Sequence, residues 1–503
     1  MKIEIMDTTL RDGEQTSGIA FTELEKLHIA KLLIEELNID RIEIASARVS
    51  EGEFNGVKRI TDWANKNKCL DRIEVLGFVD GDISINWLKQ TGAKVMNLLS
   101  KGSLKHLSGQ LHKTPEEHIK NIKESVDLAN QEGIKVNIYL EDWSNGMRNS
   151  INYVYYMLDS LKDSNIEHFM LPDTLGILNP DETYKYCKLM VDKYPGIRFD
   201  FHAHNDYDMA AANVYAAIKA GIPGIHTTIN GLGERAGNAP LSSVIPIIRD
   251  HCKMDLSVNE KKIYIVSKMI ETFSGIRIPA NKPIVGENVF TQTSGVHADG
   301  DTKNKLYYND LLPERFGRER KYAMGKTAGK SNILKNLDEI GIKLDAEALR
   351  KVTRRVVELG DRKENVTAED LPYIISDVLK SEIEKDKIKI RNYSLSLAEG
   401  LKPVATVSLE IDKKLYQETS PGDGQYDAFM KAIKKIYQDL HKKIPKLMDY
   451  VVSIPPGGRT DALVETVITW RNGKSFKTRG LDPDQTVAAI KATIKMLNMI
   501  ENE

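Results

Sequence analysis

Eight short apolar segments alternate with longer amphipathic segments through the first 275 residues of this 503-residue chain. Short apolar runs are typical of buried strands, and their alternation with helical periodicity is typical of parallel α/β folds. Eight strand–helix units close a (β/α)₈ barrel, whose usual length is about 250 residues. The sequence therefore predicts a TIM barrel with strands near Ile3–Asp7, Arg41–Ala45, Ile73–Phe78, Val95–Leu99, Val136–Leu140, His168–Leu171, Phe199–His202 and Gly224–Ile229.

Two of the intervening segments carry helix-start signals. Thr22 and Thr114 are each followed three positions later by a glutamate, which is the spacing of a capping box. Apolar residues at three- and four-residue spacing follow both threonines. These patterns predict helices over Thr22–Leu37 and Thr114–Glu132.

Polar residues lie at the carboxyl ends of most predicted strands, where the active sites of such barrels are built. A structural role would explain one or two of these positions, but not polar residues at six strand ends. The pattern therefore predicts an active site at this end of the barrel. In chain order, the polar positions are Arg11, Asp12, Glu43, Tyr139, Glu141, Asp173, Thr174, His202, His204 and the segment Asn230–Asn238.

His202 and His204 are separated by one residue at the seventh predicted strand, so their imidazoles face the same side. Two imidazoles and a carboxylate are a common ligand set for a divalent cation, with Asp12 as the candidate carboxylate and Asn238 as a further oxygen donor. The alternative is two histidines at a solvated strand end, because His-x-His pairs also occur without metal. The predicted ion is Mn²⁺, Mg²⁺, Zn²⁺ or Co²⁺, since such ligands accept all four.

Two further charged residues fit chemistry at a carbonyl group. A divalent ion polarises a carbonyl, and Arg11, next to Asp12, is placed to stabilise negative charge on the carbonyl oxygen. A structural salt bridge with Glu43 is the alternative role for Arg11. Glu141 lies two residues after Tyr139, so both face one way, and we expect Glu141 to take part in proton transfer.

The charge balance argues against some classes of partner. Lysine and arginine number 71 and aspartate and glutamate 72, which leaves a formal charge of −1 and no basic block for nucleic acid or a membrane surface. The three cysteines form no Cys-x-x-Cys pair and are expected to be reduced. The sequence has neither a signal peptide pattern at its start nor an apolar run of membrane-spanning length, so we expect a cytoplasmic protein.

Three separated motifs resemble one enzyme family. They are DTTLRDGEQ at Asp7–Gln15, HAHND at His202–Asp206 and NGLGERAGN at Asn230–Asn238. In this order they resemble the family of 2-isopropylmalate, homocitrate and citramalate synthases, over essentially the whole chain. The resemblance implies a metal-dependent acyltransferase that joins acetyl-CoA to a 2-oxoacid in a Claisen-type condensation, with Thr174 holding the oxoacid carboxylate.

The resemblance also suggests which oxoacid is used. Isopropylmalate synthases usually carry Gly-Phe-Pro where this chain has Ala45–Ser50, and a small residue where it has Tyr139. Leu76, Leu99 and Tyr139 would leave room for a methyl but not an isopropyl group. We therefore expect pyruvate, giving (R)-citramalate in a threonine-independent route to isoleucine. The alternatives are that the three residues are barrel core, or that the enzyme is a 2-isopropylmalate synthase of leucine biosynthesis.

Residues 276–390 break the alternation and are predicted to form small helical linker subdomains. They include His297 in a glycine-flanked loop, where a histidine can act as a base or have a structural role. In related synthases this segment reaches the partner subunit's active site. The resemblance implies that His297 helps to deprotonate the acetyl-CoA methyl group, and that Asp299 and Tyr307 lie near the thioester.

Residues 391–503 contain an internal duplication. Val404 and Thr406 recur as Val464 and Thr466, and the same spacing of about 60 residues relates later alanines and lysines. Each unit is predicted to form strand, turn, strand, loop and helix. A strand pair cannot bury its apolar face alone, so the two units should pack together. We expect an α+β regulatory and dimerisation domain in a homodimer.

The loops before the two predicted helices present helix amino termini, which favour a carboxylate ligand. A dimerisation module without a ligand is the alternative. The resemblance to feedback-regulated synthases favours an amino-acid effector, isoleucine. The residues that the resemblance implies for this site are Tyr426, Asp427, Leu447, Tyr450, Ile454, Thr460, Val464, Pro483 and Gln485.

Three other functions fit parts of the pattern. A lyase that cleaves the same kind of bond, such as hydroxymethylglutaryl-CoA lyase, carries a cysteine in a glycine-flanked loop, which this chain lacks. A metal hydrolase often has its His-x-His on the first strand, whereas here about 200 residues precede it. A non-catalytic amino-acid-binding regulator should keep its biological activity when His202 is replaced.

Overall fold

The computed structural model describes residues 2–361, 366, 368–379, 387–453 and 464–502. It divides into two compact units. The first contains Met1–Thr291 and Tyr308–Arg320, and the second contains Gln292–Tyr307 and Lys321–Glu503. The three-part division predicted at residues 275 and 390 stays a prediction.

Eight parallel strands form a closed barrel in the first unit, each hydrogen-bonded to the next and the last to the first. The predicted TIM barrel is confirmed, and every predicted strand is present. The strands are β1 (Glu4–Asp7), β2 (Arg41–Ser46), β3 (Ile73–Phe78), β4 (Val95–Lys101), β5 (Lys135–Glu141), β6 (Phe169–Asp173), β7 (Phe199–Ala203) and β8 (Gly224–Thr227).

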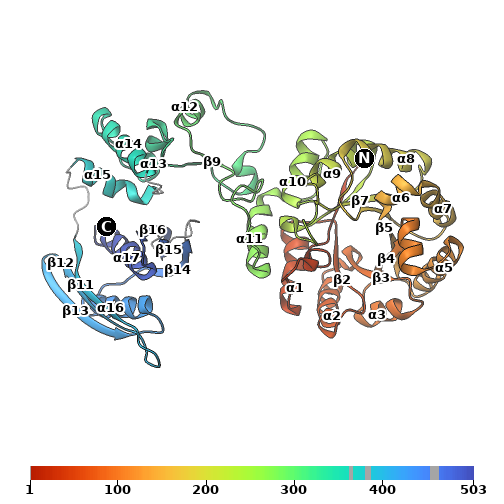
Figure 1. The fold of residues 1–503 in the computed structure, drawn as a ribbon, viewed down its shortest axis with the longest axis horizontal. Helices are drawn as coiled ribbons and strands as arrows, with labels where there is room; N and C mark the ends of the chain where they lie inside the picture. Colours follow the sequence, from red (N-terminus) through yellow and green to blue (C-terminus); the bar gives the residue numbers. More distant parts are fainter. Residues whose placement is uncertain (1, 362–365, 367, 380–386, 454–463, 503) are drawn as a thin grey trace. The chain divides into compact units, whose positions relative to one another are not determined.

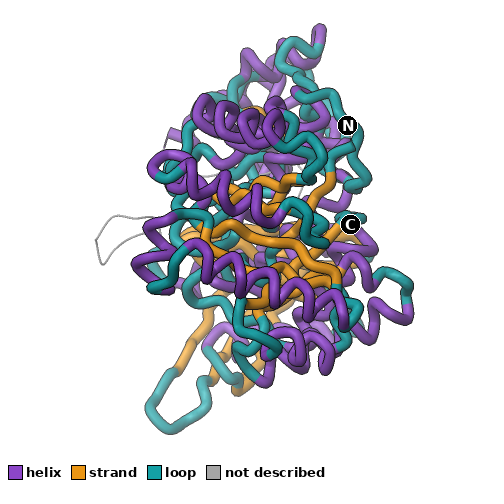
Figure 2. Tube along the Cα trace, turned by 90° about the vertical axis from the view of Figure 1, so that its right-hand side faces the viewer, coloured by secondary structure: helices purple, strands orange, loops and turns teal. Residues whose placement is uncertain are grey.

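Helices surround the barrel strands (Figures 1 and 2). Both predicted capping boxes are present, at Thr22 and Thr114. The first predicted helix changes to a π-helical turn over Leu32–Glu36. The helices are α1 (Glu23–Lys31), α2 (Glu51–Lys66), α3 (Ile83–Thr91), α4 (Leu104–His106), α5 (Pro115–Gln131), α6 (Trp143–Asn149), α7 (Ile151–Leu161), α8 (Pro180–Lys193), α9 (Ala210–Ala220), α10 (Leu241–Pro246) and α11 (Ile263–Ser274).

The barrel interior holds charged side chains where branched aliphatic residues are usual. The buried guanidinium of Arg41 contacts Asp200 and, at 3.0 Å, Glu74. Asp200 also lies 3.1 Å from Nδ1 of His168 and 3.3 Å from Nε2 of His226. All five side chains are buried, and we call them the interior ionic cluster.

Gly224 makes room for this cluster at the start of β8. A Cβ atom at position 224 would lie 1.8 Å from Oδ1 of Asp200. Any larger residue would therefore displace the carboxylate that pairs with Arg41.

The second unit contains the predicted helical segments and the duplicated region. The duplication is confirmed: each repeat is a three-stranded antiparallel sheet followed by a helix. The first strand of each sheet was not predicted, because it precedes the residues that recur. The helices and the strands of the two repeats are α12 (Gly295–Asn304), α13 (Lys330–Glu339), α14 (Ala346–Asp361), α15 (Leu371–Leu379), β11 (Ile388–Ser396), β12 (Val404–Ile411), β13 (Lys414–Pro421), α16 (Gln425–Asp439), β14 (Lys446–Ser453), β15 (Val464–Asn472), β16 (Lys474–Asp482) and α17 (Gln485–Asn502).

The two repeats share one apolar core, which confirms that they pack together. Phe429 and Ile433 of the first repeat and Trp470 and Met496 of the second are buried in the same cluster. No helix in the described part of the chain has the length and apolar character needed to cross a bilayer.

Candidate active site

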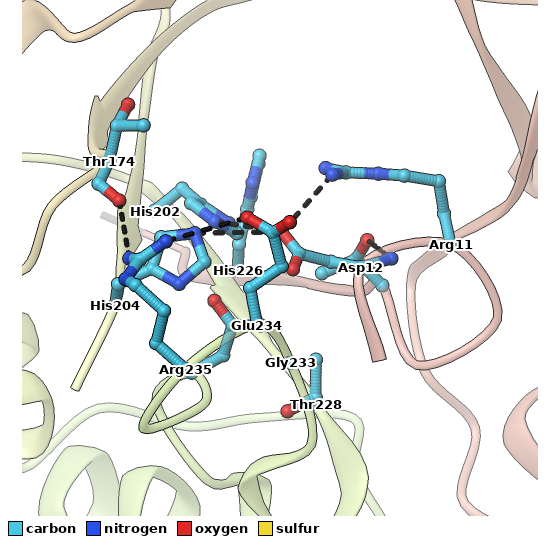
Figure 3. A network of polar contacts seen from close by, with 12 residues as sticks. Arg11, Asp12, Thr174, His202, His204, His226, Thr228, Gly233, Glu234 and Arg235 are labelled. Carbon is cyan, nitrogen blue, oxygen red and sulfur yellow. Dashed lines mark hydrogen bonds and ion pairs between the residues drawn. The ribbon is translucent and has the colours of Figure 1, made fainter. Parts of the chain in front are cut away.

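Asp12, His202 and His204 meet at the carboxyl end of the barrel (Figure 3). Asp12 follows β1, His202 lies in β7 and His204 comes directly after that strand. The Nε2 atoms of His202 and His204 lie 3.2 and 3.8 Å from Oδ2 of Asp12. All three side chains are buried, and one ligand atom from each lies within 4.8 Å of the others, close enough to share an ion.

Unsatisfied buried oxygens show that the site fits a divalent cation. Among the described residues, Oδ1 of Asp12 and Oδ1 of Asn238 are buried without a hydrogen-bond partner. Nδ2 of Asn238 donates to the carbonyl of Leu232 at 3.0 Å, which leaves its oxygen as the free atom of the amide. Buried acceptors are nearly always paired, so a carboxylate and an amide oxygen left open beside two imidazoles fit a bound ion.

Burial and the surrounding charges keep Asp12 and His204 in the protonation states that bind a metal. Burial alone would raise the pKa of Asp12, but Arg11 and His202 outweigh it and hold the pKa well below its usual range. Burial lowers the pKa of His204 to about 4, against the opposing effect of Asp12. At neutral pH the carboxylate is therefore ionised and this imidazole neutral, as metal coordination requires.

Arg11 connects the carboxylate of Asp12 to two other barrel residues. Its Nε donates to Oε2 of Glu43 at 2.6 Å and its Nη1 to Oδ2 of Asp12 at 3.1 Å. Its Nη2 donates to the hydroxyl of Tyr139 at 3.2 Å. The salt bridge with Glu43 that the sequence offered as an alternative is therefore present, and it fixes the guanidinium beside the candidate metal ligands.

A small apolar cluster, separate from the main core, lies next to Arg11. Its members are Met6, Leu76, Leu99, Tyr139 and Met170. The hydroxyl of Tyr139 also lies 3.4 Å from Oε2 of Glu43 and 3.3 Å from Nδ1 of His226. The three residues predicted to limit the oxoacid therefore lie together beside the metal ligands, and their role in specificity stays a prediction.

Glu141 and Thr174 lie at the ends of neighbouring strands. The carboxylate of Glu141 is ion-paired with Lys101, the last residue of β4. Sequence reasoning missed Lys101, because a single lysine at a strand end has no motif. The hydroxyl of Thr174 accepts a hydrogen bond from the backbone N–H of Asp142 at 2.9 Å, and its carbonyl accepts one from Arg235 at 2.7 Å.

His297, Asp299 and Tyr307 belong to the second unit. The prediction that His297 lies in a loop is wrong, because Ser294 is extended and α12 begins at Gly295, which places His297 in its first turn. The rings of His297 and Tyr307 have centroids 4.1 Å apart. Asp299 accepts a hydrogen bond from Lys303 at 2.6 Å, one helical turn later.

The predicted effector residues also belong to the second unit. Ile454 and Thr460 lie outside the described residues, as do the glycines that follow Ile454. Tyr426 of α16 and Tyr450 of β14 are in contact, with ring centroids 5.3 Å apart, and thus join the two repeats. The other described members are Asp427, Leu447, Val464, Pro483 and Gln485.

Comparison with known proteins identifies the family. The model of the HMGL-like family matches residues 2–270, which is more than half of the chain. This chain belongs to the HMGL-like family. Models described as a homocitrate synthase post-HMGL domain and a LeuA allosteric (dimerisation) domain match residues 284–364 and 365–501.

Curated relatives are similar over the full length. A putative (R)-citramalate synthase of Methanothermobacter thermautotrophicus is 35% identical, covering 100% of this chain and 99% of that protein. One of Methanopyrus kandleri is 33% identical, covering 99% and 96%. A 2-isopropylmalate synthase of Pyrococcus furiosus is also 33% identical, covering 99% of both. These relatives confirm the predicted family and its acyltransferase class, but they include both kinds of synthase.

The similarity to solved structures is low. A hydroxymethylglutaryl-CoA lyase of Pseudomonas aeruginosa is 16% identical with a TM-score of 0.44, covering 55% of this chain and 94% of that chain.

Asp7, the last residue of β1, makes the stability of the barrel depend on pH. Burial raises the pKa of its carboxyl from 3.8 to about 7, although the backbone N–H of Thr9 donates to it at 2.9 Å. Between these two pH values the folded state holds a proton that the unfolded state has lost, so the contribution of Asp7 to stability falls as pH rises. We expect Asp7→Asn to gain stability relative to wild type over this range, by up to about 4 kcal/mol.

Urea unfolding between pH 4 and pH 7.5 measures this difference. Asp163→Asn, which changes an exposed aspartate, controls for the loss of one charge. A constant difference between Asp7→Asn and wild type at every pH would contradict the raised pKa.

Proposed function

We propose that this protein condenses acetyl-CoA with pyruvate, giving (R)-citramalate and CoA, as a metal-dependent homodimer. The relatives named as citramalate and isopropylmalate synthases support a condensation of acetyl-CoA with a 2-oxoacid. The observation that supports pyruvate is the apolar cluster beside the metal ligands. In this cluster Tyr139 and Leu76 are buried, and Leu99 is partly buried.

The first task of the site is to activate the ketone. A divalent ion held by Asp12, His202, His204 and Asn238 would act there as a Lewis acid. The guanidinium of Arg11, fixed by Glu43, stabilises the negative charge that develops on the ketone oxygen. Thr174 binds the carboxylate of the oxoacid.

The second task is proton transfer at acetyl-CoA. His297, acting across the dimer interface, removes a proton from the methyl group, and Glu141 assists. The resulting carbanion attacks the ketone carbon of pyruvate, and the ketone oxygen takes up a proton. Water then cleaves the thioester and releases CoA. Asp299 and Tyr307 lie near that thioester.

A cavity of about 840 Å³ next to Arg11 supports a long co-substrate. Its lining includes the apolar residues Ile19, Phe21 and Val49, a second cation, Arg59, and three glutamates, Glu14, Glu23 and Glu53. Pyruvate alone needs a small fraction of this volume, so the cavity has room for part of an acyl-CoA chain.

We also propose that isoleucine inhibits the enzyme through the duplicated domain. The match to an allosteric dimerisation domain and the contact between Tyr426 and Tyr450 across the two repeats support this. Inhibition of CoA release by isoleucine is the expected result. Inhibition by leucine instead would favour the second candidate, a 2-isopropylmalate synthase, to which the relative from Pyrococcus furiosus points.

Thiol release with a panel of oxoacids tests the proposal directly. We expect the highest kcat/KM with pyruvate and lower values with 2-oxobutanoate, 2-oxoisovalerate and 2-oxoglutarate. Preference for 2-oxoisovalerate would reassign the enzyme to isopropylmalate synthesis. A chain that releases no CoA with any of the four would contradict the condensation itself.

Tyr139→Ala should change the choice of oxoacid. Removing the ring opens space in the apolar cluster, so we expect kcat/KM for 2-oxobutanoate relative to pyruvate to rise about tenfold or more. Tyr139→Phe is the matched control: it keeps the ring and loses the hydroxyl contact with Arg11, so the rate should fall without a change of preference. Unchanged preference in Tyr139→Ala would assign Tyr139 to the barrel core.

A further inference from the structure

We propose that Lys101 is a positioning residue that holds the carboxylate of Glu141 in place for proton transfer; this inference rests on the proposed function. The two residues are direct partners in the parallel pairing of β4 and β5. Nζ of Lys101 contacts Oε2 of Glu141. The lysine side chain is 7% exposed and that of Glu141 24%, so this is a largely buried ion pair rather than a surface one.

The ion pair lies on the functional face of its strands. Side chains alternate along a strand, so Lys101 faces the same side as Leu99, and Glu141 the same side as Tyr139. Leu99 and Tyr139 are paired two residues earlier in the same register and belong to the apolar cluster beside the candidate metal ligands. The ammonium group therefore lies next to the predicted substrate pocket, toward the carboxyl ends of the strands.

The backbone around the ion pair is held by three further hydrogen bonds. The N–H of Lys101 donates to Nε2 of the buried His118 at 3.2 Å, and its carbonyl accepts from the hydroxyl of Tyr153 at 2.9 Å. The N–H of Gly102 donates to the carbonyl of Glu141 at 2.6 Å. Both Cα positions are thus fixed, and the contact with Lys101 selects the orientation of the Glu141 side chain.

This arrangement matters because a group that transfers protons must lie within hydrogen-bond reach of the reacting atom. A glutamate at a strand end has three side-chain torsions and several competing orientations toward water. Among the described residues, Glu141 is the carboxylate in ion-pair contact with Lys101, and that contact restricts these orientations. Loss of the ammonium should therefore slow turnover more than it weakens substrate binding.

A double-mutant cycle on the full-length enzyme tests the inference. We expect Lys101→Met to lower kcat about 10- to 100-fold while KM for each substrate stays within about threefold. Lys101→Arg keeps a cation and should recover most of the rate. In the Glu141→Gln background, Lys101→Met should change kcat less than about twofold, because its effect passes through Glu141.

Lys135→Met is the matched control, because Lys135 pairs with Glu167 at 2.9 Å at the opposite, exposed end of β5. It should leave kcat unchanged, and thermal unfolding of every variant shows whether it is folded. Additive losses in the double variant, or a change confined to KM, would overturn the inference. The cycle uses whichever oxoacid the wild type turns over, so a failure of the pyruvate assignment leaves its result interpretable.

Discussion

Replacing His202 with alanine should lower kcat for CoA release by about 1,000-fold or more. Nε2 of His202 lies 3.2 Å from Oδ2 of Asp12, in the cluster that fits a divalent ion. Loss of this ligand should weaken both the binding of the ion and the polarisation of the ketone. Metal ions contribute several kcal/mol to charge stabilisation, and each 1.36 kcal/mol is a factor of ten in rate.

Metal content gives a second readout that does not depend on turnover. After dialysis against Mn²⁺, wild type should retain one ion per chain and His202→Ala much less, as measured by elemental analysis. His251→Ala removes an exposed histidine and should change neither value. A His202→Ala variant with an unchanged rate and unchanged metal content would contradict the site. A non-catalytic regulator would release no CoA in either form.

Arg41→Met should lower the free energy of unfolding by about 3–5 kcal/mol, because it leaves buried carboxylates without their cation. Burial alone would raise the pKa of Asp200, but Arg41 and the neighbouring imidazoles hold it well below its usual range. Without the guanidinium, Asp200 must be buried with less compensation or take up a proton. Glu74 also loses the 3.0 Å contact from Arg41.

Urea unfolding at pH 7 measures this loss, and Arg198→Met is a matched control. Arg198 contacts Glu4 at 2.6 Å, but its side chain is 37% exposed, so its loss should cost about 1 kcal/mol or less. Adding Asp200→Asn to Arg41→Met should restore part of the stability. An Arg41→Met variant as stable as Arg198→Met would contradict a cohesive role for the interior ionic cluster.

The parts of the structure that the sequence predicted depend on local patterns. Strand and helix periods indicated all eight barrel strands, and the Thr-x-x-Glu spacing indicated the capped helix starts at Thr22 and Thr114. The approach of Asp12 to His202 and His204 followed from one rule, that the carboxyl ends of barrel strands meet. Each of these predictions used residues close in sequence or a general property of the fold.

The parts that were missed depend on contacts between distant residues. Arg41 and Asp200 are 159 positions apart in the sequence, and each lies within a strand. Their contact is visible only in the closed barrel, because no local pattern relates them. The role of Lys101 can be recognised only when the structure pairs it with Glu141. The glycines that flank His297 suggested a loop. In the structure Ser294 is extended and a helix begins at the next residue, Gly295.

The interior ionic cluster also constrains how the barrel assembles. Arg41 lies in β2 and Glu74 in β3, whereas Asp200 and His226 lie in β7 and β8. In a barrel filled with aliphatic side chains, no strand carries a charge that needs a partner from the other half of the ring. Here a fragment of β1–β4 would lack the carboxylate of Asp200, and a fragment of β5–β8 would hold that carboxylate without its guanidinium. Folding should therefore be all-or-none across the eight strands, and separately expressed half-barrels should not fold until they are mixed.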